Sequence, residues 1–362
     1  LEVWRRETGH QMIQPGDPLV RAVATDADVG APGVPVLDLN DTAQVADFVL
    51  DQVGLARRPL FDRVLVADWS ASATPATGPG PNTIWVGDAA GDAVQARHFA
   101  TRRTAEAWIT AEIAAARDAG RRMLVGFDFA LGYPAGFAAR LTGQASAPAV
   151  WRWLAEHVTD DATNANNRFA VAAAINARLG GAGPFWGVPA DAASPALTVK
   201  KPPFPCAGLA EMRAPDTALK GAKSVWQLAG AGSVGSQSLT GLPVIHRLSQ
   251  MTGVAVWPFD APDRIATAPV VLAEVYPSLL REAVRAEVAQ GWVPDAAQVR
   301  LLSRALWRLA RSGRLGAMLD LPPDPHRAEE GAVLGAGHAA SLAAALGGAT
   351  GGATGGASGG AG

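Results

Sequence analysis

Three acidic residues stand out because each lies inside or directly after a strongly apolar run. Asp68 follows one such run, and Asp128 and Glu274 lie inside two others. Apolar runs of this length predict buried strands, and a buried carboxylate without a partner is costly. Two Mg²⁺ or Mn²⁺ ions would stabilise the ionised carboxylates and activate a water molecule for attack on a phosphodiester. The acids therefore predict a two-metal hydrolytic site.

Asp295 is a fourth candidate ligand, because it begins the predicted helix 295–312. An aspartate there accepts hydrogen bonds from the free N–H groups of the first turn and still faces a nearby site. Glu106 and Glu112 on the predicted helix 104–119 are weaker candidates, since no motif surrounds them. The simpler alternative is that each acid binds backbone N–H groups or an arginine at a strand end.

The elements that must position these acids follow a recognisable order. Apolar runs and turn residues predict three successive strands, one helix, one buried strand, an insertion and a final strand followed by helices. The predicted strands are 63–69, 82–87 and 94–99, followed by the helix 104–119 and the buried strand 123–129. The insertion covers about 135–250, and after it come the strand 270–275 and the helices 279–290, 295–312 and 336–346. This pattern indicates an α/β domain over residues 61–346.

The same residues carry a resemblance to a known fold. Residues 63–70, with the hairpin to 83–87, resemble the opening of the ribonuclease H-like fold. Residues 126–134 and 274–278 resemble a bacterial branch of that superfamily whose members are described as predicted nucleases. The resemblance covers about residues 61–345. It implies a mixed sheet with flanking helices and a helical or loop insertion.

The resemblance also implies roles for the acids. Asp68, Asp128 and Asp295 match by position the metal-binding acids of such folds, and Glu274 matches the motif of the bacterial branch. In addition, Trp69 lies beside Asp68 and could stack on a nucleobase. The expected substrate is a nucleic acid or a nucleotide ester.

The first 56 residues indicate a separate fragment. Residues 2–10, 22–26, 36–41 and 45–50 resemble the C-terminal part of the MobB family, GTP-binding adapters of molybdopterin-guanine dinucleotide biosynthesis. The match spans about 1–54 and implies a partial α/β fragment of the P-loop NTPase type, with a molybdopterin guanylyltransferase as a possible partner. The chain has no Gly-x-x-x-x-Gly-Lys-Ser/Thr loop. We therefore expect GTP binding only if such a loop precedes Leu1.

A glycine-rich segment at 230–235 fits the letters of a dinucleotide-binding fingerprint. Its context does not fit, because a poor strand precedes it and no acid lies between 236 and 259. We therefore reject a dinucleotide site. The neighbouring Lys223, Gln227 and Ser236 are candidate phosphate contacts, since Gly/Ser-rich turns expose N–H groups to anions. The alternative for Lys223 is a solvated surface charge.

Composition limits the remaining classes of function. The formal charge of −2 provides no global positive field, so any contact with nucleic acid must be local. One cysteine, Cys206, excludes an intramolecular disulfide and a cysteine-rich zinc site. No run of about 18 apolar residues predicts a membrane span. We expect a cytoplasmic protein with a disordered Gly/Ala/Thr tail at 347–362.

Two classes of function remain. The acids favour a Mg²⁺-dependent phosphodiester or phosphate-ester hydrolase fused to a MobB-like fragment. The alternative is a non-catalytic accessory or adapter protein of molybdopterin-guanine dinucleotide biosynthesis. Metal-dependent stabilisation distinguishes the first class from the second.

Overall fold

The computed structural model describes residues 23–24, 36–37, 59–91, 93–230 and 233–347. The first two ranges form strands β1 (Val23–Ala24) and β2 (Val36–Leu37), which pair in parallel. The rest of the predicted 1–56 fragment and the tail from residue 348 lie outside the described residues. The MobB-like interpretation therefore stays a prediction.

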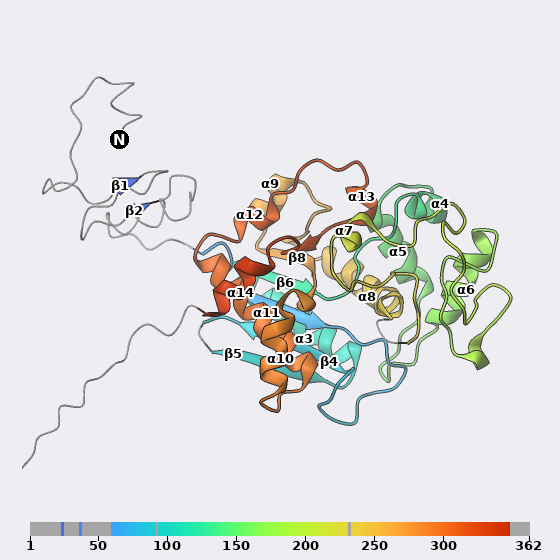
Figure 1. Ribbon diagram of the computed structural model, residues 1–362, viewed down its shortest axis with the longest axis horizontal. Helices are drawn as coiled ribbons and strands as arrows, with labels where there is room; N and C mark the ends of the chain where they lie inside the picture. Colours follow the sequence, from blue (N-terminus) through green and yellow to red (C-terminus); the bar gives the residue numbers. More distant parts are fainter. Residues whose placement is uncertain (1–22, 25–35, 38–58, 92, 231–232, 348–362) are drawn as a thin grey trace, which may run out of the picture.

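One mixed sheet forms the centre of the described domain (Figure 1). Its order is β5-β4-β3-β6-β8-β7, and β9 pairs with the same edge of β8 as β7. The strands β3, β4 and β5 are antiparallel neighbours, whereas β3, β6, β8, β7 and β9 run parallel. The bounds are β3 (Arg63–Asp68), β4 (Ile84–Ala89), β5 (Val94–Phe99), β6 (Met123–Phe127), β7 (Val254–Val256), β8 (Val270–Val275) and β9 (Val333–Leu334). The predicted α/β class with a mixed sheet and flanking helices is confirmed.

Helices cover both faces of this sheet. One face packs against α3 (Arg102–Asp118) and α8 (Val234–Ser249), and α5 (Ala147–His157) packs on α8. The other packs against α11 (Pro294–Arg311), with α10 (Arg281–Val288) and α14 (Ala339–Gly347) beside it (Figure 1). Parallel strands covered on both faces need continuous apolar sequence, and β6 and β8 are buried along their whole length.

The segment between β6 and β7 forms a helical layer beside the sheet, drawn from green to yellow in Figure 1. It contains α4 (Phe137–Thr142), α5, α6 (Arg168–Arg178), the 3₁₀ turn Ala190–Ala192, α7 (Ala214–Thr217) and α8. The short helices α9 (Pro262–Thr267), α12 (Gly316–Leu319) and α13 (Arg327–Glu330), and the 3₁₀ helix η2 (Pro277–Leu280), connect the later elements.

A glycine fixes the close packing of α11 on the sheet. A Cβ atom at Gly87 of β4 would lie 2.2 Å from the carbonyl oxygen of Val299, far inside van der Waals contact. Only glycine therefore fits here without displacing the helix. This approach brings the first turn of α11 to the end of the sheet where β3 and β6 finish.

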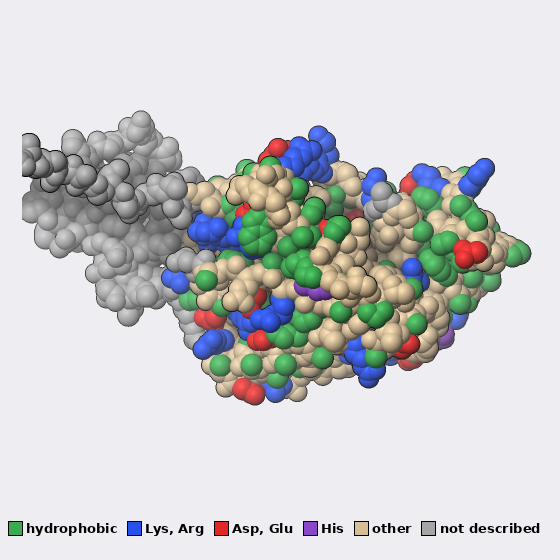
Figure 2. All heavy atoms as spheres, turned by 90° about the horizontal axis from the view of Figure 1, so that it is seen from below, with side chains coloured by type: hydrophobic (Ala, Val, Ile, Leu, Met, Phe, Trp, Pro, Cys, Tyr) green, Lys and Arg blue, Asp and Glu red, His purple; other side chains and the backbone are tan. Residues whose placement is uncertain are grey.

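The surface carries mixed charge. On the face drawn in Figure 2, blue Lys and Arg side chains and red Asp and Glu side chains are interspersed with apolar ones, in keeping with the formal charge of −2. Within the described ranges, none of the helices combines the length and the apolar character that a membrane crossing requires.

Candidate active site

The parallel pairing of β3 with β6 places Asp68 beside Asp128. Ala67 is in register with Phe127, and the next residue of each strand is the aspartate. The Asp128 N–H donates to the Ala67 carbonyl (3.1 Å), and the Trp69 N–H donates to Asp128 Oδ1 (2.9 Å). Because side chains alternate along a strand, both aspartates project toward the face that α11 covers.

Burial controls the protonation of this pair. Asp68 is only 8% exposed. Burial, followed by the charges of Asp128 and Asp295, raises the pKa of Asp68 well above its usual range, and burial raises the pKa of Asp128 to about 8. Among the described residues, no lysine or arginine forms an ion pair with either of them.

Asp295 reaches the same place from the first turn of α11. Its Oδ2 accepts the Asn82 N–H at 2.6 Å, and its carboxylate also accepts the Thr83 N–H. Burial raises its pKa, and its charge raises the pKa of both Asp68 and Asp128. The structure therefore brings together three of the four acids selected from the sequence.

Glu274 does not join them. It is in register with Phe127 rather than with Asp128, so its side chain lies on the opposite face of the sheet. There it is buried and receives two hydrogen bonds from Arg213, at 2.8 and 2.5 Å, and one from the Leu131 N–H at 2.9 Å. The predicted convergence of Glu274 with the aspartates is wrong, because a shift of one residue reverses the face of a strand.

The three aspartates line a cavity of about 630 Å³. Residues from α6 and from the start of α8 complete its walls, together with Asn82, Thr83 and Gln298. Gly230 and Ser233 before α8 line the cavity, as do Ser236 and Gln237 in its first turn. Two residues of the rejected dinucleotide fingerprint, Gly230 and Ser233, therefore border the cavity.

Arg168 supplies positive charge to the cavity, and the sequence analysis did not identify it. Its Nε donates to Ser236 Oγ (3.0 Å) and its Nη1 to Asn166 Oδ1 (2.8 Å). Burial lowers its pKa to about 10, so it stays protonated at neutral pH. Within the described ranges it forms no ion pair with a carboxylate. Arg168 lies in the first turn of α6, where the helix dipole disfavours a cation. This unfavourable position is the one feature of the sequence that could have indicated a functional role for Arg168.

Of the three predicted phosphate contacts, one lines the cavity and two do not. Ser236 lines the cavity, and its buried Oγ accepts from Arg168. Lys223 is exposed and lies outside the cavity wall. Gln227 is half-buried, and its Nε2 donates to the Ala229 carbonyl at 3.1 Å instead of reaching the cavity. Only Ser236 therefore remains a candidate contact.

The two weaker helix candidates lie away from the aspartates. Glu106 pairs with Arg247, and Glu112 pairs with Arg63. These pairs match the simpler alternative, in which an acid is held by an arginine.

Trp69 cannot stack on a base in this structure. It is fully buried and packs against Phe127 and Phe129, with ring centroids 6.3 and 6.0 Å away. Its carbonyl accepts from Gln237 of α8. Trp69 therefore fixes the loop after β3 and leaves no ring face for a ligand.

In their present positions, no three His, Cys, Asp or Glu side chains of the described residues are grouped so that they could hold a metal ion. Searches of family models, curated proteins and solved structures give no match to this chain. The family resemblances therefore stay predictions, and the geometry of the cavity carries the functional argument.

Proposed function

We propose that this cavity hydrolyses a phosphodiester or another phosphate ester with the help of a divalent cation such as Mg²⁺ or Mn²⁺. The observation that carries the proposal is the adjacent pair of the buried Asp68 and the half-buried Asp128 in a cavity that Arg168 also lines. A site with closely spaced carboxyl groups on one side and a guanidinium in the same cavity suits a cation and an anionic substrate together.

The chemistry of the donor set fits a hard cation. Such cations prefer carboxylate oxygens, and Asp68 and Asp128 are the residues that would hold one. Burial raises the pKa of each, and a bound cation would favour their ionised forms. Asp295 adds negative charge to the cavity while it accepts backbone hydrogen bonds. When bound, a cation polarises a phosphoryl oxygen and makes a water molecule more acidic.

The chain's own residues would bind and orient the substrate. Arg168 is held in place by Ser236 and Asn166, so its guanidinium is already positioned to bind a phosphate oxygen. The first turn of α8 borders the same cavity, and the positive end of the helix dipole favours an anion there. Both features support a phosphate ester over a neutral substrate.

The fold supports the same proposal. The order β5-β4-β3-β6-β8, with β4 antiparallel to its neighbours, agrees with the ribonuclease H-like sheet that the sequence resemblance predicts. The resemblance assigns metal-binding roles to Asp68, Asp128 and Asp295, and the cavity that they share supports this assignment. Glu274 is left out of the proposed site because Arg213 already neutralises it.

A role in molybdopterin-guanine dinucleotide biosynthesis is proposed only on the resemblance of residues 1–54. Co-purification with a molybdopterin guanylyltransferase would support an adapter role for that fragment.

The test replaces Asp68 with Asn and uses Asp118→Asn as the matched control, because Asp118 is an exposed acid at the far end of α3. With Mn²⁺ and bis(p-nitrophenyl) phosphate, Asp68→Asn should lose activity by about 10²-fold or more, since a bound cation contributes several kcal/mol. Saturating Mn²⁺, at about 100 times its Kd, should stabilise the parent by about 2.7 kcal/mol, Asp118→Asn equally, and Asp68→Asn much less. Equal stabilisation of all three chains, with no turnover by the parent, would contradict the proposal.

A further inference from the structure

The C-terminal half of α11 concentrates positive charge. Residues 296–319 contain five arginines and no aspartate or glutamate. Four of these arginines line a groove of about 770 Å³ between the end of α11 and α14: Arg304, Arg308, Arg311 and Arg314. No acidic side chain lines this groove among the described residues.

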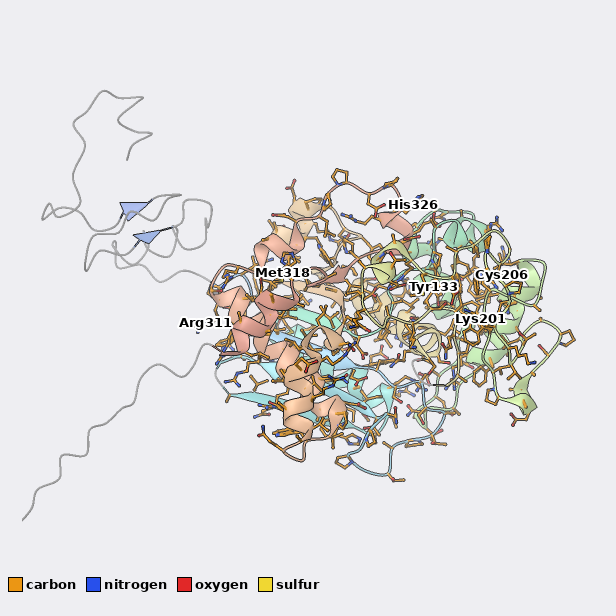
Figure 3. The ribbon with its side chains drawn as sticks, in the orientation of Figure 1. Tyr133, Lys201, Cys206, Arg311, Met318 and His326 are labelled. Carbon is orange, nitrogen blue, oxygen red and sulfur yellow. The ribbon has the colours of Figure 1, made fainter. Side chains whose placement is uncertain are left out.

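The arginines are held in different ways. Arg308 donates to the carbonyls of Ala345 and Leu346 at the end of α14 (2.9 and 3.0 Å). The Arg311 guanidinium lies 5.2 Å from the centre of the Trp307 ring, and Arg311 and Arg314 are both exposed. Figure 3 shows Arg311 next to α14, at the opposite end of the domain from Lys201 and Cys206. Two exposed guanidiniums, those of Arg311 and Arg314, therefore lie beside the anchored Arg308 in this groove.

Another arginine-lined cavity shows how this groove differs. The cavity beside α3 also contains several arginines, but Glu106, Asp160 and Asp161 line it as well. There Arg247 pairs with Glu106, and Arg102 pairs with Asp160. By contrast, none of the described residues that line the α11 groove is an aspartate or a glutamate.

We propose that this groove binds the phosphodiester backbone of a nucleic acid. Guanidinium groups bind phosphate oxygens through paired hydrogen bonds, and arginines four residues apart on a helix repeat at about 6 Å. Among the described residues of the groove wall, the one aromatic residue is Trp307, which is 6% exposed and whose Nε1 donates to the Asp62 carbonyl. Without a free aromatic face the groove contacts phosphates and not bases, so binding is independent of sequence.

The groove also sets a length for the substrate, an inference that rests on the proposed function. Asp295 in the cavity and Arg311 in the groove are 16 residues apart on one helix, which corresponds to about 24 Å. A duplex rises by the same amount in about 7 base pairs. A dinucleotide would therefore reach only the cavity, whereas a longer strand would engage both.

The test measures binding of the full chain to fluorescein-labelled 16-nucleotide single-stranded and 16-base-pair duplex DNA by anisotropy in EDTA, across a salt series. Arg311→Gln with Arg314→Gln should weaken binding by about 10- to 60-fold at 0.1 M salt. The salt slope should fall by about 1.4 for the single strand and 1.8 for the duplex. Arg311→Lys with Arg314→Lys should keep most of the affinity. The control is Arg152→Gln with Arg178→Gln, two exposed arginines of α5 and α6, which should bind like the parent.

Three results would overturn the groove proposal: no salt-dependent binding of either probe, equal binding by the parent and the double Gln variant, or binding to anionic phospholipid vesicles in place of DNA. Hydrolysis of bis(p-nitrophenyl) phosphate separates this proposal from the proposed function, because that small ester cannot reach the groove. The double Gln variant should hydrolyse it like the parent. DNA binding without any hydrolysis would leave the groove proposal standing and contradict the hydrolase.

Discussion

Replacing Asp128 with Asn should stabilise the fold at neutral and alkaline pH when divalent cations are absent. Asp128 is half-buried beside Asp68 and accepts the Trp69 N–H at 2.9 Å. Asparagine keeps an oxygen for that N–H and offers an amide that donates to Asp68. The substitution therefore preserves the shape and the hydrogen bonds while it removes a charge that the site does not stabilise.

The size of the effect follows from the pKa of Asp128, which burial raises from the ordinary 3.8 to about 8. The folded state then binds this proton more tightly than the unfolded state. The group costs no stability below about pH 4, and its cost grows as the pH rises from about 4 to about 8. At pH 7 the span of about 3 pKa units corresponds to about 4 kcal/mol. Because Asp68 and Asp128 titrate together, we expect the substitution to recover about 2–4 kcal/mol.

Urea unfolding in EDTA at several pH values between 4 and 8.5 measures this directly. The parent and the Asp118→Asn control should lose stability as the pH rises, whereas Asp128→Asn should show a flatter profile and match the parent near pH 4. Parallel profiles for the parent and Asp128→Asn, or a variant less stable than the parent at pH 8, would refute the account of the buried pair.

Two further substitutions test the roles of Arg168 and Arg213. Arg168→Gln removes the guanidinium of the cavity, so KM for a phosphate ester should rise about tenfold or more. The stabilisation by Mn²⁺ should stay at the parent's level, and an unchanged KM would exclude Arg168 as a substrate contact. Arg213→Met leaves the buried Asp216 and Glu274 carboxylates without their cation and should cost about 3–5 kcal/mol in urea unfolding. A loss below about 1 kcal/mol would show that these acids find other partners.

The sequence by itself determined the strands that carry the aspartates. The apolar runs before Asp68 and around Asp128 were sufficient to predict buried strands, because a run of this kind is stable only between two covered faces. The predicted strand 270–275 coincides with β8. The local sequence did not predict the helix α8, because its Gly/Ser-rich start and internal Pro243 disfavour a helix. Tertiary packing overrides this, since Gly241 lies against the ring of Phe129 so closely that a Cβ would be 2.3 Å away.

The tertiary structure decided which acids share a site. Glu274 and Asp128 looked equivalent in the sequence, but the register of β6 with β8 places them on opposite faces of the sheet. Arg213 and Arg168 come from the segment between β6 and β7, and no local pattern indicates that the first neutralises Glu274 whereas the second borders the aspartates. Strand pairing and long-range docking set these contacts, and both depend on residues that lie far apart in the chain.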